Sequence, residues 1–403
     1  MSAVLGNGWR EALAGRRCPR LDWGLLAAFA ALAGVGLVMV TSASINLADR
    51  ELGQPFHYLF RQAAYLLVGL PLAALVFRVR LAWWSRAGMV ALLAALALLL
   101  LVLVPGIGRT VNGATRWLAL GPVNLQVSEP AKLLVLVYLA GYLVRRADEV
   151  REHLSGFLKP MAVLGLVCLL LLAEPDFGAT VVLLATALTM TFMAGVRLGW
   201  FAVLLGLCVA ALGLLAVASP YRMARLTAFV NPWADPFNSG FQLTQSLIAI
   251  GSGGLTGLGL GGSVQKLFYL PEAHTDFVFA VLAEELGLGG VVALIGLYAF
   301  VVFRAFAIAE AARRAGEAFA SYLAYGLGTW LGLQAFINMG VNMGLLPTKG
   351  LTLPLVSYGG SSLVVMCLVA ALLLRIDYET RCSVHSLPDG APGGARRRKG
   401  RAA

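Results

Sequence analysis

Charged residues are scarce in this sequence. Only 13% of its 403 residues are Asp, Glu, Lys or Arg, whereas 59% are hydrophobic, and the mean hydropathy is +0.82. In a soluble globular protein, roughly a quarter of the residues are charged. The shortage argues against an ordinary soluble domain, and apolar runs of roughly 17–25 residues, the length that spans a bilayer, recur along the chain. We therefore expect a membrane protein.

Three kinds of site are also missing from the sequence. The five cysteines have no metal-ligand spacing, which argues against a zinc site or a disulfide framework. The glycine-rich stretch GSGGLTGLGLGGS (251–263) has neither a preceding strand nor the GxxxxGKS or GxxxxGKT pattern, so we expect no nucleotide site. Much of the net charge of +11 lies at the two ends of the chain. This distribution predicts membrane topology rather than nucleic-acid binding. The basic tail is either a positive-inside signal with no partner or a segment that contacts anionic lipid headgroups.

Ten apolar segments predict an all-α, polytopic membrane fold. They lie at 23–43, 59–77, 85–105, 127–144, 157–173, 177–195, 198–218, 277–303, 318–346 and 354–375. We divide the chain into an N-terminal segment 1–22, a membrane domain 23–376 and a basic tail 377–403, whose composition predicts disorder. The one large loop is 219–276, and its apolar residues between 241 and 250 predict a helix at the membrane interface.

The basic residues predict the orientation. With ten spans, both termini lie on the same side of the membrane. Of the 31 Lys and Arg residues, 22 lie on that side, and the other nine lie on the opposite side or at span ends facing it. We therefore place the termini in the cytoplasm and the large loop outside. Six outward residues are either solvated charges or, taken together, the mark of an anionic partner, since Arg suits bidentate contact with phosphate. They are Arg109, Arg116, Arg222, Arg225, Lys266 and Lys349.

A group of polar residues stands at the start of the eighth segment, in PEAHTDF. Pro271 breaks the structure there, and Thr275 or Asp276 is a suitable N-cap for the helix that follows. Capping needs one short polar side chain, whereas this stretch also holds Glu272 and His274. Two interpretations stay open: Asp276 only caps the helix, or its carboxylate takes a proton from a membrane-bound substrate.

Two further pairs of charged residues fall at or within apolar segments. Glu284 and Glu285 follow Asp276 by about 12–13 Å of helix, and an intramembrane carboxylate is a candidate for function. The alternative is that they pair with a buried base. Glu129 and Lys132 in VSEPAK share one helix face, so they form either an anchoring ion pair or a site where Lys132 meets a phosphate.

Three other motifs carry polar or helix-breaking residues. In AEPDFG, Glu174 and Asp176 are either turn residues or ligands of a divalent cation. Asn338 and Asn342 are one turn apart and suited to link helices. The segment LPTKGLTLPLVSYGGSS (346–362) predicts a broken or re-entrant stretch, which is tolerated in a membrane only where it lines a cavity.

Together these motifs resemble the SEDS family, the shape, elongation, division and sporulation proteins. The matching strings are GFQLTQSLIAIGSGGLTGLGLG, YLPEAHTDFVFAVLAEELG and LPTKGLTLPLVSYGGSS, with SEPAK and EPDFG upstream, and the resemblance covers about 20–376. Within the family, NPWADPFNSGFQLTQS and PTKGLTLPLVSYGGSS are more similar to the cell-division branch than to the rod-elongation branch.

The resemblance implies a peptidoglycan glycosyltransferase of the bacterial inner membrane, acting at the division septum. Such proteins polymerise lipid II, a disaccharide-pentapeptide on undecaprenyl pyrophosphate, and work with a class B penicillin-binding protein and other division proteins. The family's essential loop acid falls on Asp276, which we assign as the general base. Mg²⁺ or Mn²⁺ is expected to assist through the phosphates, with Glu174 and Asp176 as candidate ligands.

The other motif residues receive two kinds of role. The residues assigned to substrate binding are Arg109, Arg116, Glu129, Lys132, Arg225, Gln242, Gln245, His274, Lys349 and Ser357. The residues assigned to support of the site are Pro271, Glu284, Glu285, Asn338, Gly359 and Gly360.

Two other functions are compatible with the sequence. A transporter that flips lipid II would suit ten spans, broken helices and intramembrane acids, although the strongest acidic motif lies at the outer surface and no inverted repeat is evident. A scaffold that recruits the crosslinking enzyme would not depend on whether residue 276 is an acid.

Overall fold

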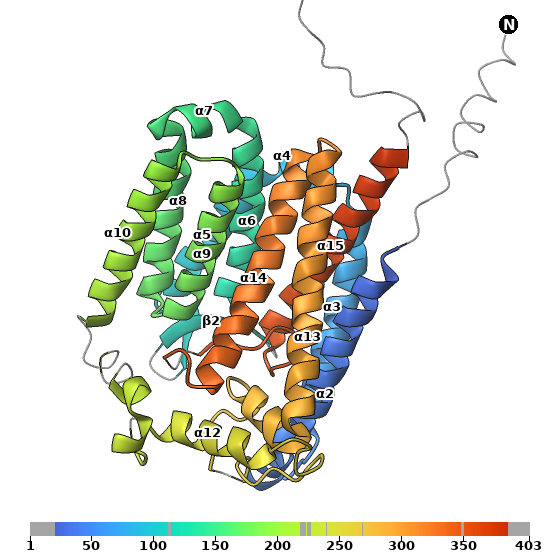
Figure 1. Cartoon of the computed structure of the whole chain (residues 1–403), viewed down its shortest axis with the longest axis vertical. Coiled ribbons are helices and arrows are strands. Elements are labelled where there is room, and N and C mark those ends of the chain that lie inside the picture. The colour runs from blue at the N-terminus through green and yellow to red at the C-terminus, as the bar shows by residue number, and fades with distance from the viewer. Residues whose placement is uncertain are drawn as a thin grey trace, which may run out of the picture.

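Most of the chain forms one bundle of helices that run in parallel and antiparallel directions (Figure 1). The computed structural model describes residues 21–385, apart from 112–113, 122, 218–222, 224–226, 239, 268 and 348–349. The α-helices are α2 (Trp23–Leu52), α3 (His57–Arg78), α4 (Leu81–Arg86), α5 (Gly88–Leu103), α6 (Ser128–Arg145), α7 (Ala147–Glu152), α8 (Leu154–Ala173), α9 (Phe177–Met193), α10 (Leu198–Val217), α12 (Phe241–Gly253), α13 (Val278–Arg314), α14 (Ala318–Asn342) and α15 (Gly360–His385). A short 3-10 helix, η1, covers Pro232–Ala234.

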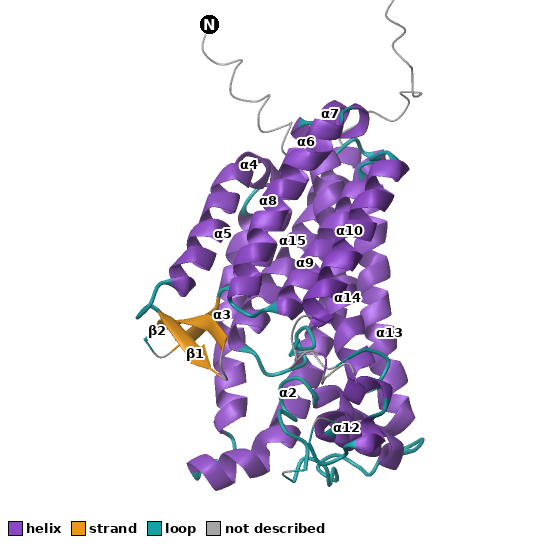
Figure 2. Cartoon of the chain, turned by 90° about the vertical axis from the view of Figure 1, so that its left-hand side faces the viewer, coloured by secondary structure: helices purple, strands orange, loops and turns teal. Residues whose placement is uncertain are grey.

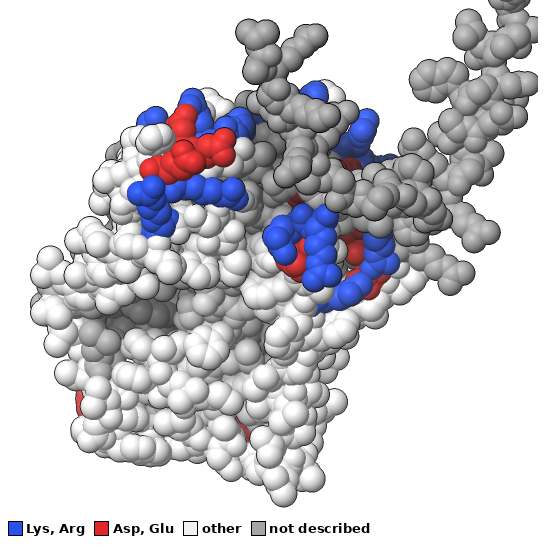
Figure 3. Space-filling model, turned by 45° about the horizontal axis from the view of Figure 1, so that its top comes forward, with Lys and Arg blue, Asp and Glu red and all other residues white. Residues whose placement is uncertain are grey.

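Each predicted apolar segment overlaps a helix, although the bounds differ. Among the described residues, α2, α3, α8, α13 and α15 are long and apolar enough to cross a membrane, and α5, α9 and α10 are shorter apolar helices. The count of ten spans stays a prediction. Helix α2 begins and α15 ends at the same end of the bundle, as the prediction requires (Figure 1). Figure 3 shows charged side chains gathered at that end and an almost uncharged flank.

A small antiparallel sheet corrects the expectation of an all-α fold. Strands β1 (Gly108–Val111), β2 (Ala114–Leu120) and β3 (Val123–Gln126) pair in the order β1-β2-β3. The sheet lies at the side of the bundle, beyond the end of α5 (Figure 2). The amide of Gln126 donates to Ser361 Oγ in α15 at 2.8 Å, which ties the sheet to the bundle.

The predicted large loop contains a short helix, and the predicted broken segment precedes α15. Helix α12 lies within 219–276 and across the end of the bundle opposite α7 (Figure 1). Residues 343–359 form no helix where they are described, and α15 begins at Gly360 rather than at the expected position 354. Helix α14 is central, because it packs against α13, α9, α6 and α15.

Candidate active site

One face of α14 carries a row of buried amide side chains. Gln334, Asn338 and Asn342 follow one another at intervals of four residues, so they lie on the same face of the helix. Each is at most 2% exposed. Asn342 contacts another helix, α13 (Val278–Arg314), through the amide of Ala280, whereas Asn338 contacts the loop before it and the broken segment. Gln334 did not stand out in the sequence.

Asp276 lies directly beside this row. Its backbone carbonyl accepts hydrogen bonds from Nδ2 of Asn338 at 2.9 Å and from Nδ2 of Asn342 at 3.0 Å. The residue is half-buried, and its Oδ2 lies only 3.2 Å from the position that a Cβ on Gly350 would occupy. The carboxylate therefore faces the broken segment before α15.

The cap of α13 comes from another helix. Phe277 stands at the N-cap position, so the expectation of an N-cap at Thr275 or Asp276 is wrong. The amide of Ala280 in the first turn donates to Asn342 Oδ1 at 3.2 Å. Asn342 thus fixes both the backbone of Asp276 and the start of the helix that follows it.

His274 anchors the same loop from the other side. Its ring centroid lies 4.6 Å from that of Tyr58 in α3 and 5.6 Å from that of Tyr358, and its carbonyl accepts from the amide of Tyr358 at 2.9 Å. Burial lowers the pKa of His274, against the weaker raising effects of nearby Glu272 and Glu51, which favours the neutral ring. Pro271 is exposed at the start of the turn. The loop before α13 is therefore held by two separate elements.

The broken segment is tied to α14 through its backbone. Carbonyl oxygens of Leu351 and Thr352 accept from Asn338 Nδ2 at 2.6 Å and from Gln334 Nε2 at 3.0 Å. The Oγ of Ser357 accepts from the amide of Leu353 at 2.9 Å. Ser357 therefore stabilises the segment, and its contact with substrate stays a prediction.

Two glycines support this arrangement. A Cβ on Gly360 would lie 2.3 Å from the ring of Tyr65, and a Cβ on Gly359 would lie 3.3 Å from Thr352. Gly360 thus allows α15 to begin close to α3. The supporting role of both glycines in the site stays a prediction.

Lys132 lies in the interior as part of an ion pair. Its Nζ is 2.8 Å from Glu129 Oε1, 3.2 Å from Gln334 Oε1 and 4.7 Å from the ring centroid of Trp330. The residue is 1% exposed. The ion-pair interpretation of the SEPAK motif fits these contacts. Glu129 Oε2 is buried with no hydrogen-bond partner among the described residues.

The turn between α8 and α9 holds two buried acids. Asp176 Oδ1 accepts from the amide of Ala179 at 3.1 Å and caps α9, as expected of a turn residue. Both carboxylate oxygens of Glu174 and Oδ2 of Asp176 are buried with no hydrogen-bond partner among the residues described. Burial, followed by the charge of Asp176, raises the pKa of Glu174 to about 8, although Arg116 opposes this shift.

The two arginines of the sheet differ in their surroundings. Arg116 on β2 donates from Nε to the carbonyl of Glu174 at 3.1 Å and also donates to the carbonyl of Pro175. Arg109 on β1 is exposed and lies opposite Trp117 in the sheet register. Arg116 thus fixes the turn between α8 and α9, and Arg109 remains accessible.

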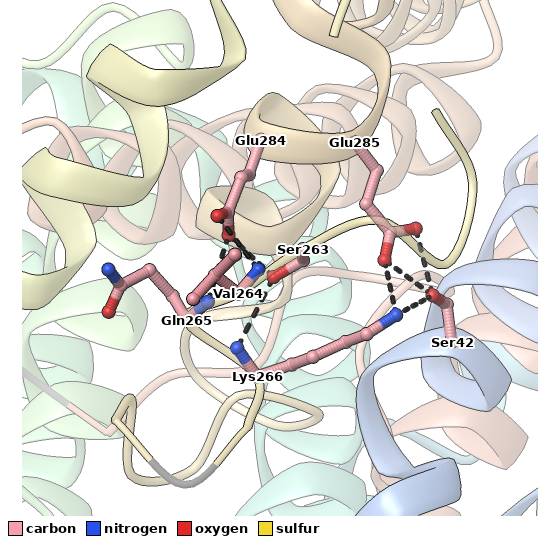
Figure 4. A network of polar contacts seen from close by, with 7 residues as sticks. All are labelled: Ser42, Ser263, Val264, Gln265, Lys266, Glu284 and Glu285. Carbon is pink, nitrogen blue, oxygen red and sulfur yellow. Dashed lines mark hydrogen bonds and ion pairs between the residues drawn. The ribbon is translucent and has the colours of Figure 1, made fainter. Parts of the chain in front are cut away.

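Glu284 and Glu285 are satisfied by a different part of the chain (Figure 4). Glu284 accepts from Ser263 Oγ at 2.5 Å and from the amide of Val264 at 3.0 Å. Glu285 pairs with Lys266 Nζ at 2.7 Å, and both residues contact Ser42 Oγ in α2. Glu285 therefore pairs with a buried base, as one of the two interpretations expects, whereas the printed partners of Glu284 are a hydroxyl and backbone amides.

The remaining predicted site residues are less constrained. Gln242 and Gln245 are half-buried on α12. Arg222, Arg225 and Lys349 lie outside the described residues. In the part of the chain that the structure describes, no group of three or more His, Cys, Asp or Glu side chains forms a metal site.

Comparison with known proteins settles the family. Residues 23–382 match the family described as cell cycle protein, which takes in FtsW, RodA and SpoVE. The chain belongs to this family. The predicted resemblance to SEDS proteins is confirmed, and the protein is a multi-pass membrane protein.

Relatives of known name are similar over nearly the whole chain. A probable peptidoglycan glycosyltransferase FtsW from Thioalkalivibrio sulfidiphilus is 61% identical over 383 residues, covering 94% of this chain and 96% of the relative. The protein of the same name from Legionella pneumophila is 58% identical over 360 residues, covering 89% and 91%. These names confirm the predicted similarity to the cell-division branch.

Solved structures of similar chains agree with the fold. One belongs to a peptidoglycan synthase complex described as coordinating polymerization and crosslinking, with 34% identity, a TM-score of 0.74 and coverage of 89% of this chain and 98% of that one. Another is the rod shape determining protein RodA of Thermus thermophilus, with 32% identity, a TM-score of 0.66 and coverage of 89% and 96%.

Proposed function

We propose that this protein is a peptidoglycan glycosyltransferase that polymerises lipid II into β-1,4 glycan strands during septal wall synthesis. The observation that carries this function is the setting of Asp276 in a family of that activity. The acid is half-buried, its backbone is held by α14, and its carboxylate lies against the broken segment. Such a carboxylate is suited to general base catalysis at a defined position.

In the reaction, Asp276 removes the proton from the 4-hydroxyl of the acceptor sugar. The hydroxyl oxygen attacks the anomeric carbon of the donor, and the bond from that carbon to the pyrophosphate oxygen breaks. The anomeric configuration inverts, because an α-linked pyrophosphate becomes a β-linked glycoside. The proton stays on Asp276, and undecaprenyl pyrophosphate leaves with the bonding electrons.

The leaving pyrophosphate needs positive charge. Exposed Arg109 is free to reach it directly, whereas Arg116 and Lys132 would have to exchange contacts that they make within the protein. Arg225 and Lys349 belong to the same proposed group. Gln242, Gln245, His274 and Ser357 are proposed to orient the sugars. Groups that keep their position stabilise the transition state without reorganisation, which favours Arg109 over Arg116 and Lys132.

A divalent cation fits one part of the site. Glu174 and Asp176 offer three buried oxygens that lack a hydrogen-bond partner among the described residues. Oxygen atoms of this kind are what Mg²⁺ and Mn²⁺ prefer, and water or phosphate oxygens would have to complete the shell. When bound, the cation would neutralise negative charge on the pyrophosphate. No nucleotide is needed, because the pyrophosphate linkage supplies the driving force.

We further propose the setting in which the protein works. It would cross the inner membrane ten times, with both termini in the cytoplasm and the large loop outside. It would act at the division septum with a class B penicillin-binding protein, which crosslinks the strands, and with other division proteins. The similarity to a chain from a synthase complex supports such a partner.

The alternatives receive less support. A transporter would use intramembrane acids that change their partners or protonation, whereas the carboxylate of Glu285 is 2.7 Å from the buried ammonium group of Lys266. A scaffold role is compatible with polymerisation. It gives no reason for the position of Asp276.

The decisive experiment compares wild type with Asp276→Asn in a purified system. Labelled lipid II is supplied with the crosslinking partner and with Mg²⁺ or Mn²⁺, and the length of the glycan strands is measured. We expect strands from wild type and none from Asp276→Asn, because the amide keeps the shape but cannot accept the proton. Equal strands from both proteins, at equal folding and partner binding, would show that the base lies elsewhere. No strands from wild type with either metal would refute the polymerase and call for a lipid II flipping assay.

A further inference from the structure

We infer, on the basis of the proposed function, that Asn338 and Asn342 are positioning residues for Asp276. They do not touch substrate in this role. They set the direction in which the carboxylate points by holding the peptide group that follows it.

The contacts are direct and well inside hydrogen-bond range. Both Nδ2 groups donate to the same carbonyl, at 2.9 and 3.0 Å, and the two asparagines are 2% and 0% exposed. A carbonyl oxygen with two amide donors from one rigid helix fixes the ψ angle of Asp276. The carboxylate then keeps only its own side-chain rotations.

Each asparagine also makes a second contact that defines the site. Asn338 Nδ2 donates to Leu351 O at 2.6 Å, so one amide group bridges the loop before α13 and the broken segment. Asn342 Nδ2 donates to the carbonyl of Asn338 at 2.9 Å, and its Oδ1 accepts from Ala280 at 3.2 Å. The loop with the acid, the segment that faces it and the start of α13 are therefore all located by one turn of α14.

The same helix also holds the buried cation. Gln334, one turn before Asn338, accepts from Lys132 Nζ at 3.2 Å. Successive residues of the row are separated by about 6 Å along the helix axis. A single rigid element thus relates the proposed base to the cation that is proposed to meet the leaving group. Misplacement by about 1 Å costs enzymes up to about 100-fold in rate.

The test uses substitutions on α14 and a control substitution on α12 in the same polymerisation assay. Asn338→Ala removes the bridge, and Asn342→Ala removes a donor to Asp276 together with the cap of α13. The matched control is Ser246→Ala, because Ser246 is fully buried and donates to the backbone carbonyl of Asn342 at 2.9 Å without touching Asp276. Asn338→Ser restores a shorter hydroxyl donor.

We expect Asn338→Ala to lower kcat about 10- to 100-fold while KM for lipid II stays within about twofold. Asn338→Ser should recover part of the lost kcat, and Ser246→Ala should keep the wild-type kcat. Thermal unfolding of each variant in detergent separates kinetic effects from loss of folded protein. If Asn338→Ala does not fold, the comparison of Asn338→Ser with Ser246→Ala decides in the same way.

The outcomes separate this inference from the proposed function. If Asp276→Asn is inactive and Asn338→Ala keeps the wild-type kcat, only the positioning role is refuted. If Ser246→Ala loses as much kcat as Asn338→Ala at equal thermal stability, the effect is a general loosening of α14 and the positioning role is also refuted. If Asp276→Asn is as active as wild type, the assignment of the base fails and the positioning role fails with it.

Discussion

At the scale of single residues, the buried acid Glu174 should make the stability of the protein depend on pH. Its side chain has no accessible surface, its oxygens have no hydrogen-bond partner among the described residues, and its pKa is raised to about 8. An unfolded Glu ionises near its ordinary pKa, whereas the folded protein keeps the proton until about pH 8. The native state therefore binds more protons than the unfolded state over this window, and its stability falls as pH rises.

We expect Glu174→Gln to be more stable than wild type, by a margin that grows from about pH 4.5 to about pH 8 and is constant above. Gln cannot ionise, so it does not carry the cost of burying a charge. Thermal unfolding in detergent at a series of pH values measures the margin. The matched control is exposed Glu152, substituted by Gln, and this surface change should leave the unfolding temperature close to that of wild type. A margin that is independent of pH would contradict the raised pKa.

The same variants test the proposed cation without any assay of activity. Mn²⁺ or Mg²⁺ bound at this turn would displace the proton, so the metal should raise the unfolding temperature of wild type most at alkaline pH. The metal should raise the unfolding temperature of Glu174→Gln by a smaller amount. Equal stabilisation of both proteins would place the cation elsewhere.

At the scale of elements, α13 is not one continuous helix. Gly287 has φ 63° and ψ −163°, which breaks the helical hydrogen bonding. The glycine-rich stretch fills the gap, because the amides of Leu258 and Gly259 donate to the carbonyls of Glu284 and Glu285 at 3.0 Å each. A Cβ on Gly257 would lie 2.2 Å from the carbonyl oxygen of Glu285, so glycine is required at this close approach.

The buried ion pair beside this break should be essential for stability. Lys266→Met leaves the carboxylate of Glu285 buried, with Ser42 as its one remaining partner among the described residues. Loss of one member of a buried pair costs about 3–5 kcal/mol. The double variant Lys266→Met with Glu285→Gln should recover most of this loss, because no charge remains buried. Unfolding in detergent measures both.

The control for this pair is an ion pair at the surface. Arg313 contacts Glu310 at 2.7 Å, but its side chain is 65% exposed. Exposed pairs contribute little, so Arg313→Met should unfold close to wild type. If the double variant is as unstable as Lys266→Met alone, the loss of stability comes from altered packing and not from the unpaired charge.

At this scale, the sequence predicts features that depend on residues close together in the chain, and it misses those that depend on residues far apart. Hydropathy identifies the helices because each satisfies its own backbone hydrogen bonds. The cap of α13 was missed because it comes from Asn342, far along the chain, and the glycine-rich stretch was explained only by the helix it contacts. The sheet had a local signal, Asn112–Gly113 between two runs with β-branched or aromatic residues, which favours a hairpin.

The residues of the candidate site also fall into those that the sequence identifies and those that it does not. Asp276 is recognisable from its motif, and pairing with a buried base is one of the two interpretations that the sequence leaves open for Glu284 and Glu285. Gln334 and Tyr58 were not recognisable, because a single amide or ring in an apolar helix has no signature until its neighbours are known. Their partners come from α6, the broken segment and the loop before α13.

At the scale of the whole molecule, the bundle has one charged end and an almost uncharged flank (Figure 3). We expect the charged end to face the cytoplasm and α13 to cross the membrane. Arg314→Cys and Phe237→Cys, in a chain without its five native cysteines, then lie on opposite sides. Both positions are well exposed, with 75% of the Arg314 side chain and 83% of Phe237 accessible.

A membrane-impermeant maleimide applied to intact spheroplasts should label Phe237→Cys. It should label Arg314→Cys only after the membrane is permeabilised. Labelling of both cysteines from the same side would contradict the crossing of α13 and with it the predicted ten spans.

The break in α13 also bears on how the chain is made. The backbone of the glycine-rich stretch forms hydrogen bonds with residues of α13 that follow it by only about 30 positions. The residues of the stretch that take part are Gly254, Leu255, Leu258 and Gly259. They leave the ribosome before the broken helix does, so their amides and carbonyls are already available when Gly287 emerges. A break that would expose unpaired backbone to lipid is thereby closed by its nearest upstream neighbour. Insertion of this helix need not wait for α14 or α15 to be synthesised.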